Sequence, residues 1–240
     1  MRASFFSAAI VAAALSVSPA AHAVSAGELD TFSAGIEGWF AGGGPLGQVP
    51  SPAPSVVSTG GPAGAGDSFM LITANGSAAA GGRLVAMNAA QWGGGYAAAG
   101  ITSIGMDLRN LGTSDLTIRL YLEDPIPGPP LNEAVTTFSV FLPAGGAWTH
   151  AVFPIAPGDL TVLQGSATTL LSNATVLRIF NGVVPDFPPE RVSGLLGVDN
   201  IQAIPEPETL ALMAGGLLFV AARVRRRGVR CDRGSAIALN

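Results

Sequence analysis

Hydrophobic and polar residues alternate through the centre of the chain. The clearest run is Leu116–Glu123, where four aliphatic side chains alternate with Thr, Arg, Tyr and Glu. A shorter alternation covers Ile104–Leu108, and the residues between the two runs include Asn, Gly and Ser. A period of two is typical of a strand with one buried face, so the pattern predicts two strands joined as a hairpin.

Six further apolar runs, separated by Gly, Pro and Asn, predict strands at residues 68–74, 83–88, 135–142, 148–155, 176–181 and 198–203. Pro45–Gly66 is rich in small residues and predicts a surface loop with at most one edge strand, at Ser55–Ser58. Pro125–Pro130 predicts a stiff loop outside any ladder, and Gly158–Asp159 before Leu160 predicts one helical turn. Many short strands with almost no helical periodicity predict an all-β fold, an antiparallel two-sheet sandwich of the jelly-roll kind.

The first 23 residues have the organisation of a secretory signal peptide. Arg2 precedes an apolar stretch, Phe5–Val17, which Pro19 ends, and Ala21-His22-Ala23 places small residues where a signal peptidase cleaves. The alternative is a short buried helix. The sequence therefore predicts an exported chain whose mature part begins near Val24 and whose folded domain covers 24–203.

The carboxy-terminal end has the organisation of a membrane anchor. Ile204–Thr209 contains Pro205, Glu206 and Pro207, an apolar run follows, and four arginines close it: Arg223, Arg225, Arg226 and Arg227. The apolar run is about 15 residues, short of the roughly 20 that span a bilayer comfortably, but tilt and the reach of arginine side chains compensate. The pattern predicts a transmembrane helix at about 209–222, an outer domain, a cytoplasmic arginine stop and a cytoplasmic tail, 228–240.

Pro205-Glu206-Pro207, the apolar span and the arginine cluster together resemble the PEP-CTERM sorting signal of Gram-negative bacteria. The resemblance implies transient anchoring in the inner membrane, processing near the Pro-Glu-Pro by an exosortase, and export to the cell surface or extracellular matrix. Such proteins usually stop just after the arginines, whereas this chain continues through Gly228–Asn240. The alternative is an uncleaved tail anchor.

Composition excludes several classes of function. The chain contains 12 arginines and no lysine, and the predicted mature domain carries five arginines against 13 acidic residues, a net charge of −8. This balance argues against nucleic-acid binding, and the absence of lysine excludes Schiff-base and P-loop chemistry. The single cysteine, Cys231, falls in the predicted tail, so the domain has no disulfide or thiol nucleophile. With His150 as its only histidine, the domain cannot form a zinc site, and we interpret His150 as a half-exposed strand residue.

Three short motifs resemble galactose-binding-type jelly rolls, the fold of many carbohydrate-binding modules. They are Asp30-Thr31-Phe32 with Gly38-Trp39, then Gly146–Thr149, and finally Gly197–Ile201. The resemblance implies that the first and last strands pair. It also implies a structural calcium held by Asp30 and Asp199, with further oxygens from Glu28 or Asn200. Since calcium requires six to eight oxygen ligands, the alternative is two ordinary strand-end carboxylates.

The aromatic residues allow two interpretations. Trp39 and Phe40, or Trp92 and Tyr96 around Gly93–Gly95, would offer flat faces on which sugar rings stack. The glycines would let a ligand or a neighbouring backbone approach closely. The alternative is that these rings fill the core, because each removes a large apolar area from water.

Evidence for catalysis is weak, and we expect no enzyme. Glu123–Asp124, Asp186 and Glu190 could supply the two carboxylates of a glycosidase, but no serine lies in a Gly-x-Ser-x-Gly motif. The sequence thus predicts a structural or adhesive protein of the cell surface, associated with extracellular polysaccharide. The alternatives are a carbohydrate-binding module with structural calcium and a secreted glycoside hydrolase.

Overall fold

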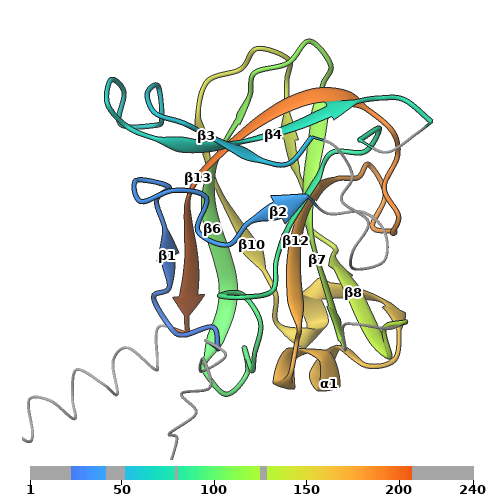
Figure 1. The fold of residues 1–240 in the computed structure, drawn as a ribbon. Helices are drawn as coiled ribbons and strands as arrows, with labels where there is room; N and C mark the ends of the chain where they lie inside the picture. The colour runs from blue at the N-terminus through green and yellow to red at the C-terminus, as the bar shows by residue number, and fades with distance from the viewer. Residues whose placement is uncertain (1–22, 42–51, 79–80, 125–128, 207–240) are drawn as a thin grey trace, which may run out of the picture.

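Two antiparallel β-sheets pack face to face in the computed structural model, which describes residues 23–41, 52–78, 81–124 and 129–206 (Figure 1). Sheet A has the order β10-β6-β13-β4-β3, and β1 also pairs with β13. Sheet B has the order β11-β8-β7-β12-β5-β2, and β9 also pairs with β7. The predicted all-β sandwich is confirmed.

The strands of sheet A are β1 Leu29–Asp30, β3 Ser55–Val57, β4 Phe69–Asn75, β6 Ile101–Asn110, β10 Thr149–Pro154 and β13 Ser193–Pro205. Those of sheet B are β2 Phe40–Ala41, β5 Val85–Asn88, β7 Leu116–Asp124, β8 Asn132–Thr136, β9 Val140–Leu142, β11 Leu160–Gln164 and β12 Val176–Asn181. A 3-10 turn at Pro157–Asp159 and one helix, α1 at Ala167–Ser172, complete the described elements.

The core lies between the sheets and is built from alternate strand positions. On β7 the inward side chains are Leu116, Ile118, Leu120 and Leu122, and all are fully buried. Ile104, Met106 and Leu108 of β6 enter the same core cluster from the other sheet. The predicted hairpin between these two strands is therefore wrong: β6 belongs to sheet A and β7 to sheet B, and their apolar faces meet across the core.

The connection between β6 and β7 crosses from one sheet to the other. Asn110, buried at the end of β6, donates through its side-chain nitrogen to the carbonyls of Ser114 (2.8 Å) and Leu142 (3.0 Å). Its side-chain oxygen accepts from the amide of Gly112 at 3.0 Å. These three bonds satisfy the backbone where the chain leaves sheet A.

Two other local predictions are corrected. The run 135–142 is two strands, β8 and β9, which pair with successive parts of β7. Residues 160–164 form strand β11 rather than a helical turn, and the short helix α1 follows them. Ser166 caps α1 by accepting from the amide of Thr169 at 3.4 Å, a cap that the sequence reading missed.

The described chain begins and ends at the same end of the sandwich (Figure 1). β1 pairs with β13, with Leu29 opposite Gln202 and Asp30 opposite Ile201, so the predicted pairing of first and last strands is confirmed. The amide of Gly27 also donates to the carbonyl of Ala203 at 2.9 Å.

Candidate functional site

A buried carboxylate holds two tryptophans in the core. Asp30 Oδ2 accepts from the indole nitrogens of Trp39 at 2.7 Å and Trp92 at 2.8 Å. The hydroxyl of Tyr96 donates to the carbonyl of Trp92 at 2.7 Å. Burial raises the pKa of Asp30 to about 6, and the two indole hydrogen bonds partly oppose this rise.

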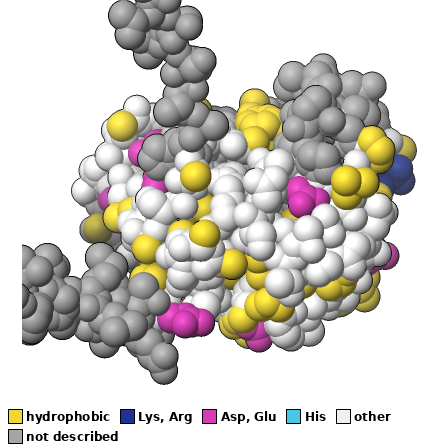
Figure 2. Space-filling model, turned by 90° about the horizontal axis from the view of Figure 1, so that it is seen from below, with side chains coloured by type: hydrophobic (Ala, Val, Ile, Leu, Met, Phe, Trp, Pro, Cys, Tyr) yellow, Lys and Arg dark blue, Asp and Glu magenta, His cyan; other side chains and the backbone are white. Residues whose placement is uncertain are grey.

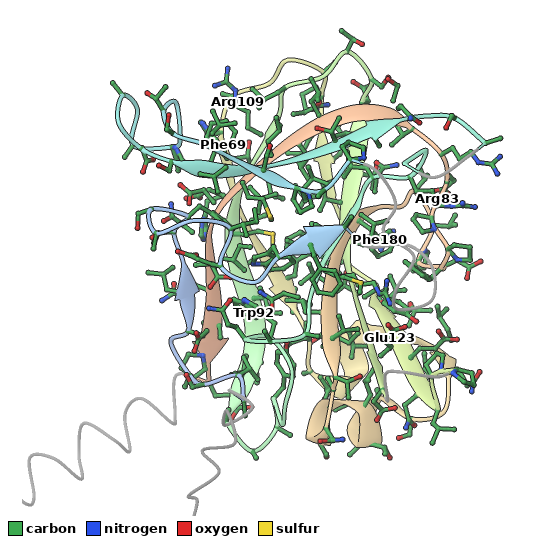
Figure 3. All side chains as sticks on the ribbon, in the orientation of Figure 1. Phe69, Arg83, Trp92, Arg109, Glu123 and Phe180 are labelled. Atoms are coloured by element: carbon green, nitrogen blue, oxygen red, sulfur yellow. The ribbon has the colours of Figure 1, made fainter. Side chains whose placement is uncertain are left out.

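The predicted sugar platform of Trp39, Trp92 and Tyr96 is therefore wrong. Their exposed fractions are 2%, 0% and 0%, so no ring face is open to a ligand, and Trp92 lies between the sheets (Figure 3). The adjacent glycines admit backbone instead of a ligand. A Cβ at Gly94 would lie 3.0 Å from the Cβ of Ala23, and the amide of Val24 donates to the carbonyl of Gly93.

The predicted calcium ligands have different environments. Asp30 is committed to the two indoles, which makes it a core acceptor and unsuited to a metal. Asp199 lies opposite Asp107 on the outer face of sheet A. Its Oδ1 accepts from the amide of Asn200 at 2.8 Å, while its Oδ2 is buried with no hydrogen-bond partner among the described residues.

Of the two predicted ligands, only Asp199 is suited to bind calcium. Its buried carboxylate oxygen has no hydrogen-bond partner among the described residues, and such an oxygen is the hard donor that calcium binds. Burial, together with the smaller effect of the negative charges of Asp67, Asp107 and Glu37, raises the pKa of Asp199 to about 7, and the hydrogen bond from the Asn200 amide partly opposes this rise. However, the described residues contain no group of three or more His, Cys, Asp and Glu side chains that could hold a metal. Calcium at Asp199 stays a prediction.

His150 lies on the edge strand β10, with 60% of its side chain exposed, as the sequence predicts for a strand residue open to solvent. Its Nδ1 lies 2.8 Å from Asp107 Oδ1, and the side-chain nitrogen of Asn200 donates to Asp107 Oδ2 at 2.8 Å. Asp107 is therefore shared by two polar side chains on the outer face of sheet A.

The outer face of sheet B carries a second cluster, which the sequence reading missed. It consists of the outward positions of β7 and its neighbours: Tyr121, Glu123, Glu133, Arg178 and Phe180, here called the outer-face cluster. Arg178 forms a buried ion pair with Glu123, and its guanidinium lies 5.6 Å from the centre of the Tyr121 ring. Figure 3 shows Glu123 and Phe180 on this side of the sandwich.

Tyr121 joins two carboxylates. Its hydroxyl oxygen lies 2.7 Å from Glu123 Oε2 and 2.6 Å from Glu133 Oε2. Because a phenol has one proton to donate, the two carboxylates share it. Burial and these carboxylates raise the pKa of Tyr121, so it remains a neutral donor.

A segment that pairs with no described strand, Gly182–Arg191, crosses the outer-face cluster, and we call it the strap. Arg119 fixes its start by donating to the carbonyls of Gly182 at 3.0 Å and Val183 at 3.2 Å, and it also donates to those of Thr136 and Thr137. Arg83 fixes its end by donating to the carbonyl of Pro189 at 2.5 Å. Figure 3 labels Arg83 on the same side as Phe180.

The end of β13 leads directly into the candidate sorting signal. Residues 203–227 match a family model described as the PEP-CTERM protein-sorting motif. The chain carries this sorting motif. The match includes Pro205, Glu206 and Pro207 and all four predicted stop arginines, and it covers 25 of the 240 residues.

The first part of the PEP-CTERM motif belongs to the folded sandwich. Pro205 is buried and lies opposite Ile101 in sheet A, and the amide of Glu206 donates to the carbonyl of Gly100 at 3.0 Å. Residues 1–22 of the predicted signal peptide lie outside the described residues, and so do Pro207, the predicted membrane helix and the stop arginines. Within the described part of the chain, no helix combines the length and apolarity needed to cross a membrane.

Solved structures with a similar fold include the family 11 carbohydrate-binding module from Clostridium thermocellum in complex with a β-1,3-1,4-mixed-linked tetrasaccharide. It shares 18% identity over 75% of this chain and 97% of that chain, with a TM-score of 0.50. An exo-β-agarase matches at 13% identity over 76% of this chain but 25% of that chain, with a TM-score of 0.50. Identities this low establish a shared fold alone. A search of the curated proteins finds no match.

Proposed function

We propose that this protein is exported, held briefly in the inner membrane, processed by an exosortase at its PEP-CTERM motif, and retained at the cell surface as a structural or adhesive component of extracellular polysaccharide. The observation that carries the proposal is the sorting motif, which continues directly from strand β13. The signal peptide predicted at the other end supports the same route.

Association with polysaccharide is supported by the shared fold with a carbohydrate-binding module and by the charge of the domain. A net charge of −8 disfavours polyanions and suits neutral polymers. The face that the sorting end presents is mainly uncharged, with scattered acidic groups (Figure 2).

The role is binding rather than catalysis. Among the acids considered for a glycosidase, Glu123 is committed to Arg178 and Tyr121, and Asp124 accepts from Asn132 at 3.0 Å. Glu190 accepts from the amide of Val183 at 3.3 Å. None of these contacts places two free carboxylates across an open site, as glycoside hydrolysis requires.

Mass spectrometry of the protein from native cells tests the sorting route. The wild-type product should end near the Pro-Glu-Pro and lack Cys231. A Glu206→Ala/Pro207→Ala variant should remain full length in the membrane fraction. A truncation after Arg227, which leaves the motif intact, should be processed like the wild type.

Cosedimentation with cell-free matrix tests the polysaccharide association. The mature wild type should sediment with the polymer and be released when the polymer is degraded enzymatically. Full-length protein dissolved in the cytosol with its leader attached would refute the export proposal. Mature protein free in the medium would refute retention alone.

A carbohydrate-binding module with a structural calcium is the second candidate. The orphaned buried oxygen of Asp199 favours it, because a bound cation would satisfy that oxygen. A glycan array probed with the mature protein separates the candidates: a module binds a defined sugar, whereas a structural component shows no selectivity.

A further inference from the structure

The strap is chemically unable to become a strand of sheet B. It contains Pro185, Pro188 and Pro189, each of which lacks an amide proton for a ladder. Val183 and Val184 are exposed, at 64% and 53%, whereas Pro189, at the Arg83 anchor, is buried. The strap is held over the sheet by the two arginine anchors, by the bond from the Gly182 amide to the Thr117 carbonyl, and by one aromatic ring.

That ring is Phe187. It lies nearly parallel to Tyr121, with centroids 4.2 Å apart and planes 21° apart, and it meets Phe180 edge to face at 5.8 Å. Tyr121 and Phe180 lie on the outer face of sheet B, and both are buried because Phe187 of the strap packs against them. A pyranose ring stacks on a tyrosine in the same flat arrangement, because its C–H groups face the negative π surface.

The polar groups beneath Phe187 are not fully satisfied by it. Arg178 Nε is buried with no hydrogen-bond partner in the described residues, and the Arg178 guanidinium lies 5.5 Å from the centre of the Phe187 ring. The carboxylates of Glu123 and Glu133 share a single phenol proton. Arg178 Nε is buried and Glu133 is half-buried, and both favour a partner that offers hydroxyl groups, which donate as well as accept.

We propose that the strap is an internal cover over a carbohydrate-binding site, with the Phe187 ring in the place of a sugar ring on Tyr121. When the strap lifts, Tyr121 and Phe180 supply the stacking faces, and Arg178 and Glu133 bind ring hydroxyls. The ligand is a neutral polysaccharide, because the domain carries a net charge of −8 and Glu123 and Glu133 lie within the site itself. This inference rests on the proposed association with polysaccharide and adds its regulation.

Only molecules in which the strap is lifted can bind the polysaccharide. The apparent affinity is therefore the affinity of the open site multiplied by the fraction of molecules with a lifted strap. Removing the ring should raise that fraction by about tenfold, the effect expected of one aromatic stack. The full chain with Phe187→Ala, purified in detergent, should therefore bind soluble mixed-linked β-glucan or agarose about tenfold more tightly than the wild type by isothermal titration calorimetry. Phe187→Tyr, which keeps the stack, should bind like the wild type.

Phe141→Ala is the matched control, because Phe141 is an exposed aromatic residue of β9 in the same sheet, outside the strap. It should bind like the wild type. If Phe187→Ala does not fold, Arg83→Ala tests the same cover from its anchor at the end of the strap, with an expected gain of about threefold.

The cover proposal is overturned if Phe187→Ala folds but binds both neutral polymers with unchanged affinity. It is also overturned if the variant gains equally in affinity for alginate, a polyanionic polysaccharide. An unchanged Arg83→Ala protein does so where Phe187→Ala fails to fold. Retention in the native matrix is measured separately on the wild type, so either failure leaves the proposed function standing. Loss of matrix retention with a normal gain in Phe187→Ala would instead refute the proposed function.

Discussion

Replacing Asp30 by asparagine should change the pH dependence of stability. Asp30 is 1% exposed, and its pKa rises from 3.8 to about 6 on folding, mainly because burial disfavours the charged carboxylate. Between these two values the native protein binds more protons than the unfolded chain, so its stability falls as the pH rises. A pKa rise of this size corresponds to about 3 kcal/mol of unfolding free energy.

The asparagine side chain of Asp30→Asn would keep an oxygen that accepts from the indoles but would carry no charge, so it mimics the protonated aspartic acid. The wild type and the variant should therefore have similar unfolding free energies near pH 4. The wild type should then lose about 3 kcal/mol relative to the variant between pH 4 and pH 7. Urea unfolding followed by tryptophan fluorescence measures this difference, because Trp39 and Trp92 both contact Asp30.

Tyr96→Phe is the control from the same buried cluster. It removes one hydrogen bond to the Trp92 carbonyl and should lower stability by about 1 kcal/mol at every pH in this range. Asp199 contributes a pH dependence of the same sign, but it is present in all three proteins and cancels from the comparison. A difference between the wild type and Asp30→Asn that stays constant from pH 4 to pH 7 would refute the reasoning.

Changes at other single sites have equally specific expected outcomes. Arg119→Met should destabilise the domain by about 3 kcal/mol in urea unfolding, because four backbone carbonyls lose their donor; a change below about 1 kcal/mol would contradict this. Millimolar calcium should raise the melting temperature relative to EGTA, and Asp199→Asn should abolish that rise, whereas identical melting curves would exclude the calcium site. The processed carboxy terminus should lie at Glu206 or beyond, because Pro205 is buried in β13; a mass ending before Ile204 would show that the strand opens during processing.

Strand positions were predictable wherever one face of a strand is buried. The alternation of Leu116, Ile118, Leu120 and Leu122 marked β7 correctly, and Val176–Asn181 matches β12 residue for residue. The same pattern cannot say which sheet a strand joins. It places apolar side chains on one face, and two strands facing one core from opposite sides satisfy it as well as a hairpin does.

The candidate sites were harder to predict, because they depend on contacts distant in sequence. Trp92 and Asp30 are 62 residues apart, and only the fold shows that the tryptophan is an internal donor rather than an exposed platform. The outer-face cluster is hidden for a related reason. Tyr121 and Arg178 occupy outward strand positions, which usually face solvent, and a strap with no strand pattern covers them.

The pairing of β1 with the end of β13 has a geometric consequence for a tethered protein. Strand β6 runs from Ile101, opposite Pro205, to Asn110, and ten residues at about 3.3 Å each cover about 30 Å. A tether at the Pro205 pole thus leaves the turn at 111–115 about that far from the lipid surface. In the membrane-anchored form, an epitope inserted in this turn should be the most accessible to antibody on spheroplasts, since the sandwich itself acts as the spacer.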